Sequence, residues 1–251
     1  ALALAQHPRL QTLELEWNQL GDAGVAQLAG ALGASVLERL GLQRNGLGDG
    51  AATVLAAALG KNTRLRNLSF EGNDIGPAGA RALGTTLTTN RALRTLNLAL
   101  NTIGPEGASG LAAGLLANDG LETLELDETA IGDAGATALA RALRINRSLR
   151  RLRLQRNGIG DAGALALAEA LRLNTGLVSL NLDLNAVGPV GAAELLAAAQ
   201  ASSVLRELTL DRNHIYPALG EEQAGVGLTI PQATLDDLSA LMAARKEPTA
   251  G

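Results

Sequence analysis

Acidic side chains recur at one fixed place in a repeated pattern, two residues before a recurring Asn or Thr. The members of this column are Glu16, Glu71, Asp127, Asp183 and Asp211. Adjacent strands of a sheet lie about 4.8 Å apart, so such carboxylates could share a cation or raise one another's pKa. The column is interrupted, however, by Gln43, Ala99 and Gln155. These gaps favour a solvated acidic strip that meets a partner's Lys and Arg side chains over a catalytic acid pair or a cation site.

The densest charge cluster joins Glu125, Asp127 and Glu128 to Arg153 and Arg156, one repeat further on. Further basic residues lie across the same repeat boundary, at Arg141, Arg144, Arg147, Arg150 and Arg151. A basic cluster can bind nucleic acid, but bases also need aromatic side chains on which to stack. The chain has one Trp, one Tyr and one Phe. Solvated faces, pairing between repeats or a charged protein partner are therefore the better interpretations.

The sequence offers few candidate residues for other kinds of catalysis. The two histidines, His7 and His214, lie far apart in the repeat array, and the chain has no cysteine. Disulfides, thiolate metal sites and a cysteine nucleophile are therefore excluded, and no P-loop or dinucleotide motif is present. We predict no catalytic residue, no cofactor and no metal site, and hence no enzyme. No apolar run approaches the ~20 residues of a membrane span and no signal-peptide pattern appears, so we expect a cytoplasmic protein. The net charge of −4 is too mild to imply a polyanion or polycation partner.

A pattern L-x-x-L-x-L-x-x-N-x-[LIV]-G positions all of these side chains. Its framework Asn recurs at steps of 28 residues after a first step of 27, with Thr129 in one position. The Asn positions are 18, 45, 73, 101, 157, 185 and 213. Recurrence at this period is typical of a solenoid, in which each unit buries its apolar face only by stacking on its neighbours.

The unit from Leu149 to Asn174 illustrates the expected structure of each repeat. Leu152-Arg153-Leu154 alternates with the period of a short strand, and Asn157 follows where the chain turns away. Small and apolar residues at helical spacing come next and predict an outer helix. Its start carries either Asp or Pro in successive repeats, and both suit a helix start, because Asp accepts N–H bonds and Pro pre-sets φ.

These repeats resemble the ribonuclease-inhibitor-like class of leucine-rich repeats, which includes ribonuclease inhibitors, NOD-like receptor sensor regions and Ran GTPase-activating proteins. The resemblance covers about residues 1–216. It implies an α/β fold, a right-handed leucine-rich-repeat horseshoe solenoid of about eight 28-residue repeats, with parallel strands on the concave face and helices on the convex face. The resemblance says little about function, because members of this class bind unrelated partners through their variable positions.

The two ends differ in sequence. Residues 1–6 align with the second half of an outer helix, so we expect the solenoid, 1–216, to begin inside a repeat and to belong to a longer chain or a complex. Residues 217–251 depart from the pattern. There we expect a C-terminal cap with an amphipathic helix near 234–246. A detachable helix that binds a partner is the alternative.

The leading hypothesis is a non-enzymatic scaffold or sensor module for protein–protein interaction, within a larger cytosolic or cytoskeletal assembly. A GTPase-activating protein of the Ran-activating type is the alternative. We expect a protein partner on the concave face, no membrane and no nucleic acid. Trp17 is the anchor expected from its side-chain type, unless it contacts an upstream repeat. The predicted partner-binding residues are Trp17, Arg44, Glu71, Leu100, Glu125, Asp127, Glu128, Arg153, Arg156, Asp183 and Arg212.

Overall fold

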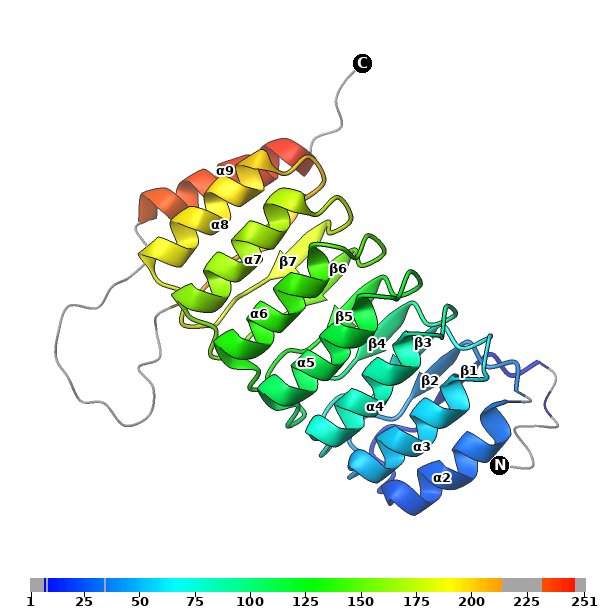
Figure 1. Ribbon diagram of the computed structural model, residues 1–251. Helices are drawn as coiled ribbons and strands as arrows, with labels where there is room; N and C mark the ends of the chain where they lie inside the picture. Colours follow the sequence, from blue (N-terminus) through cyan, green and yellow to red (C-terminus); the bar gives the residue numbers. More distant parts are fainter. Residues whose placement is uncertain (1–6, 8, 34, 214–231, 247–251) are drawn as a thin grey trace, which may run out of the picture.

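The computed structural model is an array of strand–helix units in which the strands form one layer and the helices the other (Figure 1). It describes the chain except residues 1–6, 8, 34, 214–231 and 247–251. The expectation of a half-repeat at residues 1–6 and the boundary predicted at 216/217 therefore lie outside the described residues, as does His214. The predicted α/β solenoid of leucine-rich repeats is confirmed.

The described strands pair in parallel, in sequence order, into one eight-stranded sheet. They are β1 (Thr12–Glu14), β2 (Arg39–Gly41), β3 (Asn67–Ser69), β4 (Thr95–Asn97), β5 (Thr123–Glu125), β6 (Arg151–Arg153), β7 (Ser179–Asn181) and β8 (Glu207–Thr209). The central Leu of each strand pairs with the central Leu of the next, from Leu13 and Leu40 onwards. From β1 to β2 the spacing is 27 residues, one fewer than in later repeats. The register is still kept, because the missing residue falls in the loop between the helix Gly21–Leu32 and β2.

Each strand except the last leads, within the described residues, into a helix of 11 to 13 residues. The helices are α2 (Gly21–Leu32), α3 (Asp49–Leu59), α4 (Pro77–Leu87), α5 (Gly104–Leu115), α6 (Gly132–Leu143), α7 (Asp161–Leu173), α8 (Pro189–Ala201) and α9 (Gln232–Lys246). Their inner faces bury Leu and Ala against the strand leucines. Burying a Leu side chain stabilises the fold by about 1.5–3 kcal/mol, so repeated Leu layers suffice where aromatics are scarce.

An Asn column closes the bend after each strand, as the sequence predicts. Asn73 donates from Nδ2 to the carbonyl oxygens of Leu42 and Phe70, at 3.0 and 2.7 Å. Its Oδ1 accepts the backbone N–H groups of Asn45 and Leu47, at 2.9 and 3.1 Å. One buried amide thus joins two repeats and satisfies backbone groups that water cannot reach.

Thr129 occupies the same column and is fully buried. Its hydroxyl donates to Leu126 O at 2.6 Å and lies 3.0 Å from Asn157 Oδ1. Among the described residues its side chain makes no hydrogen bond to the preceding repeat, because a hydroxyl is shorter than an amide. The substitution therefore weakens one repeat junction without interrupting the fold.

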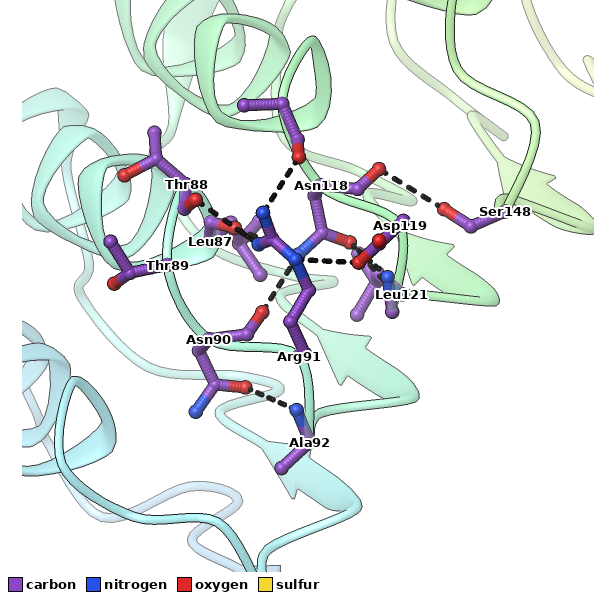
Figure 2. Close-up of polar contacts among 12 residues, drawn as sticks. Leu87, Thr88, Thr89, Asn90, Arg91, Ala92, Asn118, Asp119, Leu121 and Ser148 are labelled. Carbon is purple, nitrogen blue, oxygen red and sulfur yellow. Dashed lines mark hydrogen bonds and ion pairs between the residues drawn. The ribbon is translucent and has the colours of Figure 1, made fainter.

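A second Asn column lies at the opposite ends of the helices, and the sequence-based expectations do not include it. Its members are Asn62, Asn90, Asn118, Asn146 and Asn174, all buried. Asn118 donates to Leu87 O and Asn90 O, and its Oδ1 accepts the N–H groups of Gly120 and Leu121. Figure 2 shows Asn118 beside Asn90 in this position. Both ends of every central helix are thus fastened to the next repeat.

The Asp residues at helix starts act across the repeat boundary. Asp133, in the first turn of α6, accepts the backbone N–H groups of Gly160 and Gly163 at 2.7 and 2.9 Å. Asp161 accepts those of Gly188 and Gly191 in the same way. The carboxylate of one repeat therefore caps the helix of the next, where it also meets the positive end of the helix dipole.

Repeats with Pro in place of this Asp leave the next helix start without a carboxylate. Pro77 precedes Gly104, and Pro105 precedes Gly132, in the following repeats. Both glycines adopt left-handed backbone, with φ of 63° and 57°, and donate to a carbonyl of the next repeat. After Asp, the equivalent Gly160 is extended instead. The choice between Asp and Pro in one repeat thus correlates with the loop conformation of its neighbour.

Candidate partner-binding surface

One column of residues on the strand face has left-handed backbone in all eight repeats. Its members are Trp17, Arg44, Gly72, Leu100, Glu128, Arg156, Leu184 and Arg212, with φ between 52° and 67°. From Trp17 to Leu184, each backbone N–H donates to a carbonyl of the next repeat, as Trp17 N does to Gln43 O at 3.0 Å. This conformation costs a non-glycine residue about 1–2 kcal/mol. Because it recurs in every repeat, it belongs to the framework, and only the side chains vary.

Six of the predicted partner-binding residues belong to this left-handed column, namely Trp17, Arg44, Leu100, Glu128, Arg156 and Arg212. The other five lie on the strands or directly after them, at Glu71, Glu125, Asp127, Arg153 and Asp183. All eleven therefore share the strand face, but they form separate groups along it.

The first group is Trp17, Arg44 and Gly72, from three consecutive repeats. The Arg44 guanidinium lies over the Trp17 ring, 4.7 Å from its centroid. A Cβ atom on Gly72 would approach Arg44 Cγ to 2.8 Å, so the arginine stem lies against this glycine. The indole nevertheless remains 69% exposed. A cation–π contact of this exposed kind contributes about 0.5–1 kcal/mol and holds the indole in place without covering it.

The second group is the central charge cluster, which the structure brings together as predicted. Arg153 Nε donates to Asp127 Oδ2 at 2.6 Å, and Arg156 donates to Glu128 Oε1 at 3.2 Å. Asp127 Oδ1 also accepts the backbone N–H of Gln155 at 2.8 Å. Asp127 is nearly buried, so its bonds hold the two repeats together as well as facing outwards. Two acidic and two basic members of the cluster are therefore paired within the chain.

Within this cluster, the pKa values of Glu125 and Arg153 are shifted from their ordinary values. Burial raises the pKa of Glu125, and the nearby carboxylates of Asp127 and Glu71 raise it further, while Arg153 lowers it. The hydrogen bond to Asp127 raises the pKa of Arg153. Structural charge networks perturb pKa values as catalytic sites do, and the shift of Glu125 follows from its burial and its charged neighbours.

The remaining predicted residues lie apart from these two groups. Glu71 Oε2 accepts a hydrogen bond from Asn97 Nδ2 at 3.0 Å. Asp183 Oδ1 accepts the backbone N–H of Asp211 at 2.8 Å. Leu100 is half-exposed and Arg212 is exposed. Within the described part of the chain, no three His, Cys, Asp or Glu side chains come together as a metal site.

The arginines at the helix ends are largely used within the fold. Arg147 donates to the carbonyl oxygens of Leu143 and Arg144 and, in the next repeat, Leu173. Arg91 does the same for Leu87, Thr88 and Ala117 and pairs with Asp119, as Figure 2 shows for the labelled residues. Arg147 and Arg91 thus satisfy carbonyl groups at the helix C-termini, and within the basic cluster this accounts for Arg147.

These strand–helix units, stacked through Leu layers and Asn columns, define a repeat solenoid whose surface side chains vary from unit to unit. The profile of the family described as Leucine Rich repeat matches residues 6–29, 61–84, 89–112, 120–140, 146–168 and 173–196, more than half of the chain. The chain belongs to this family. A comparison with curated proteins finds no match.

Among solved structures, the actin-binding site 2 of leiomodin-1 is similar at a TM-score of 0.51 and 18% identity, over 67% of this chain and 88% of that one. The C-terminal domain of Caenorhabditis elegans tropomodulin is similar at a TM-score of 0.51 and 15% identity, over 66% and 92%. At these identities the likeness concerns the fold. Along the described residues, no helix is both long and apolar enough to span a membrane.

Proposed function

We propose that this protein is a non-enzymatic interaction module that binds a protein partner through its strand face, with Trp17 as the main anchor. The observation that carries the proposal is the indole of Trp17, 69% exposed yet held 4.7 Å from the Arg44 guanidinium. Trp and Arg dominate interface energetics, and a side chain already fixed loses little entropy on binding. The rigid strands that carry the other predicted residues support the same assignment.

The central charge cluster serves a different purpose in this proposal. Asp127 is already paired with Arg153 and Glu128 with Arg156, so a partner gains little from these four charges. Charges of both signs in fixed positions select the register of a partner and repel wrong ones. We therefore assign specificity to Glu125, Asp127, Glu128, Arg153 and Arg156, and affinity to Trp17 and Arg44.

We further propose the ribonuclease-inhibitor-like subtype and a scaffold or sensor role within a larger cytosolic or cytoskeletal assembly. The 28-residue period with a full helix in each repeat supports the subtype. The leiomodin-1 domain is described as an actin-binding site, so purified actin is a sensible first partner to test. The GTPase-activating alternative has no specific support among the described residues, and multiple-turnover GTP hydrolysis with candidate GTPases tests it.

Photo-crosslinking tests the face that is used. A photo-reactive residue at Arg44 should capture the partner, whereas one at Val190, exposed on α8, should not. With the identified partner purified, Trp17→Ala should weaken binding by about tenfold or more in calorimetry, because a buried Trp anchor is worth about 2 kcal/mol or more. Val190→Ala is the matched control. Binding that survives Trp17→Ala but fails in Val190→Ala would refute the proposal.

A further inference from the structure

A strip of exposed apolar side chains lies on the helix side of the molecule, apart from the predicted partner-binding residues of the strand face. Leu116, Ile145 and Leu173 are 48%, 63% and 52% exposed. They follow or end helices α5, α6 and α7, and so belong to three consecutive repeats. Single exposed apolar residues are normal on a protein surface, but a row from adjacent units marks an interaction surface.

Two free cations adjoin this strip. Arg141 and Arg144 lie one turn apart at the end of α6, and both are exposed. In the described part of the chain their guanidiniums make no hydrogen bond or ion pair, whereas Arg147 is bound to carbonyl groups and Arg172 to Glu194. Free arginines beside exposed Leu and Ile side chains are thus available to an outside partner.

The surface between α5 and α6 is hollowed next to these residues. A cavity of about 160 Å³ is lined by Leu116 and Arg141 and floored by alanines, including Ala113 and Ala138. The hollow continues towards the helix starts as a cavity of about 520 Å³, where Glu106 and Asp133 contribute. The groove is therefore basic and apolar at one end and acidic at the other, with small side chains between.

We propose that this helix-end patch, comprising Leu116, Arg141, Arg144, Ile145 and Leu173, docks an acidic amphipathic helix of a partner protein. The patch presents no unpaired strand edge, so an extended peptide gains no backbone hydrogen bonds there, whereas a helix ridge fits between two helices. Apolar residues of the partner cover the Leu and Ile side chains, and its carboxylates pair with the two arginines. Glu106 and Asp133 repel carboxylates and so fix the direction of the bound helix.

The test uses the full chain and a synthetic helical peptide of about 15 residues, long enough for marginal helicity. The peptide carries a Leu stripe, Glu in one half and neutral Gln in the other, so that it is acidic, with fluorescein attached. A second peptide has every Glu replaced by Lys and has the same Leu stripe. Fluorescence anisotropy should show that the acidic peptide binds at least about tenfold tighter than the basic one, since charge complementarity sets this preference.

Variants of the chain separate this patch from the strand face. The double variant Arg141→Glu/Arg144→Glu should reverse the preference between the two peptides, and Ile145→Ser should weaken both. Trp17→Ala should leave peptide binding unchanged, so the outcome does not depend on the proposed function. Circular dichroism checks that each variant is folded.

Three results would overturn the proposal. The first is no binding of the acidic peptide at about millimolar concentration, the range of very weak complexes. The second is equal affinity for both peptides. The third is self-association of the wild-type chain that the Arg141→Glu/Arg144→Glu variant abolishes, because the occupant would then be a second copy of this chain.

Discussion

Left-handed backbone outside glycine is the most regular single-residue feature of this chain. It recurs at the residue before each framework Asn or Thr129, except that Gly72 precedes Asn73. This column includes Trp17 and Arg44, to which affinity is assigned, and Glu128 and Arg156, to which specificity is assigned. It also occurs at Ala130, the residue after Thr129, with φ of 55°. The equivalent Ala186, two repeats later, does not have a positive φ. The residue type at this position therefore does not reveal its backbone conformation.

Ala130→Gly should stabilise the protein by about 0.5–1 kcal/mol, because glycine adopts positive φ without the clash of a Cβ atom. The matched control Ala186→Gly should destabilise it by about 0.5 kcal/mol, since there only the added freedom of the unfolded chain counts. Urea unfolding with an unchanged slope measures both. Equal effects at the two positions would contradict the difference in backbone conformation.

Glu125→Gln should stabilise the protein at neutral pH and have little effect in acid. Burial, with Asp127 and Glu71, raises the folded-state pKa of Glu125 above its ordinary value of 4.5. The ionised form therefore disfavours folding, and the wild type loses this part of its stability as pH rises from 4.5 through the folded-state pKa. Urea unfolding across that range measures the difference between variant and wild type.

Glu106→Gln, which removes an exposed carboxylate on the helix face, controls for the change in net charge in this comparison. A stabilisation by Glu125→Gln that is largest in acid would mean that Glu125 favours folding through its ionised form, contrary to the raised pKa.

At the scale of elements, period and composition suffice to predict the strands, the helices and the column of Asn18 to Asn213. The second column, from Asn62 to Asn174, recurs at the same period, so the same argument could have predicted it. Other features need coordinates. The caps that Asp133 and Asp161 supply join residues 27 and 30 positions apart, and a local helix-start rule does not specify which helix they serve.

Helices α4 and α5 pack unusually closely because glycines face one another. A Cβ atom on Gly114 would lie 2.1 Å from Gly84 O, a backbone atom that cannot move aside. Gly114→Ala should therefore destabilise the fold by about 1–3 kcal/mol despite better helix propensity. Gly30→Ala is the control, since Gly30 lies inside α2 with nothing within 4 Å of the added Cβ.

Gly30→Ala should stabilise by about 0.5–1 kcal/mol, the difference in intrinsic helix propensity. Thermal and urea unfolding of both variants give the comparison. If both substitutions stabilise the protein, the result would contradict the close approach of α4 and α5 at Gly114.

At the scale of the whole molecule, the site was predicted less fully than the fold. The shared strand face of all eleven residues follows from their place in the repeat. The pairing of Asp127 with Arg153, and the stacking of Arg44 on Trp17, depend on side-chain conformations that a linear pattern does not contain. The sequence also does not predict that Leu116, Ile145 and Leu173 are exposed, because Leu and Ile at the ends of helices normally suggest core packing.

Each repeat contacts its neighbours, so if α9 is the expected cap, the effect of losing its contacts should remain local. Leu238 and Met242 of α9 are buried, and Arg245 donates to the carbonyl oxygens of Leu205 and Gln200. The double variant Leu238→Ala/Met242→Ala should lower the local opening free energy by roughly 2 kcal/mol or more, about a thirtyfold rise in amide exchange. Hydrogen exchange with mass spectrometry should place this rise in α8 and β8.

Strands β1–β5 should keep their exchange rates in this variant, because stability in a linear array is a sum of repeat and nearest-neighbour contributions. Asp237→Ala, an exposed change on the same helix, is the matched control and should leave α8 and β8 protected. A uniform rise from β1 to β8 would instead mean that the array unfolds as one cooperative unit. No rise in α8 or β8 would mean that α9 is not a cap, and would favour a helix free to bind a partner.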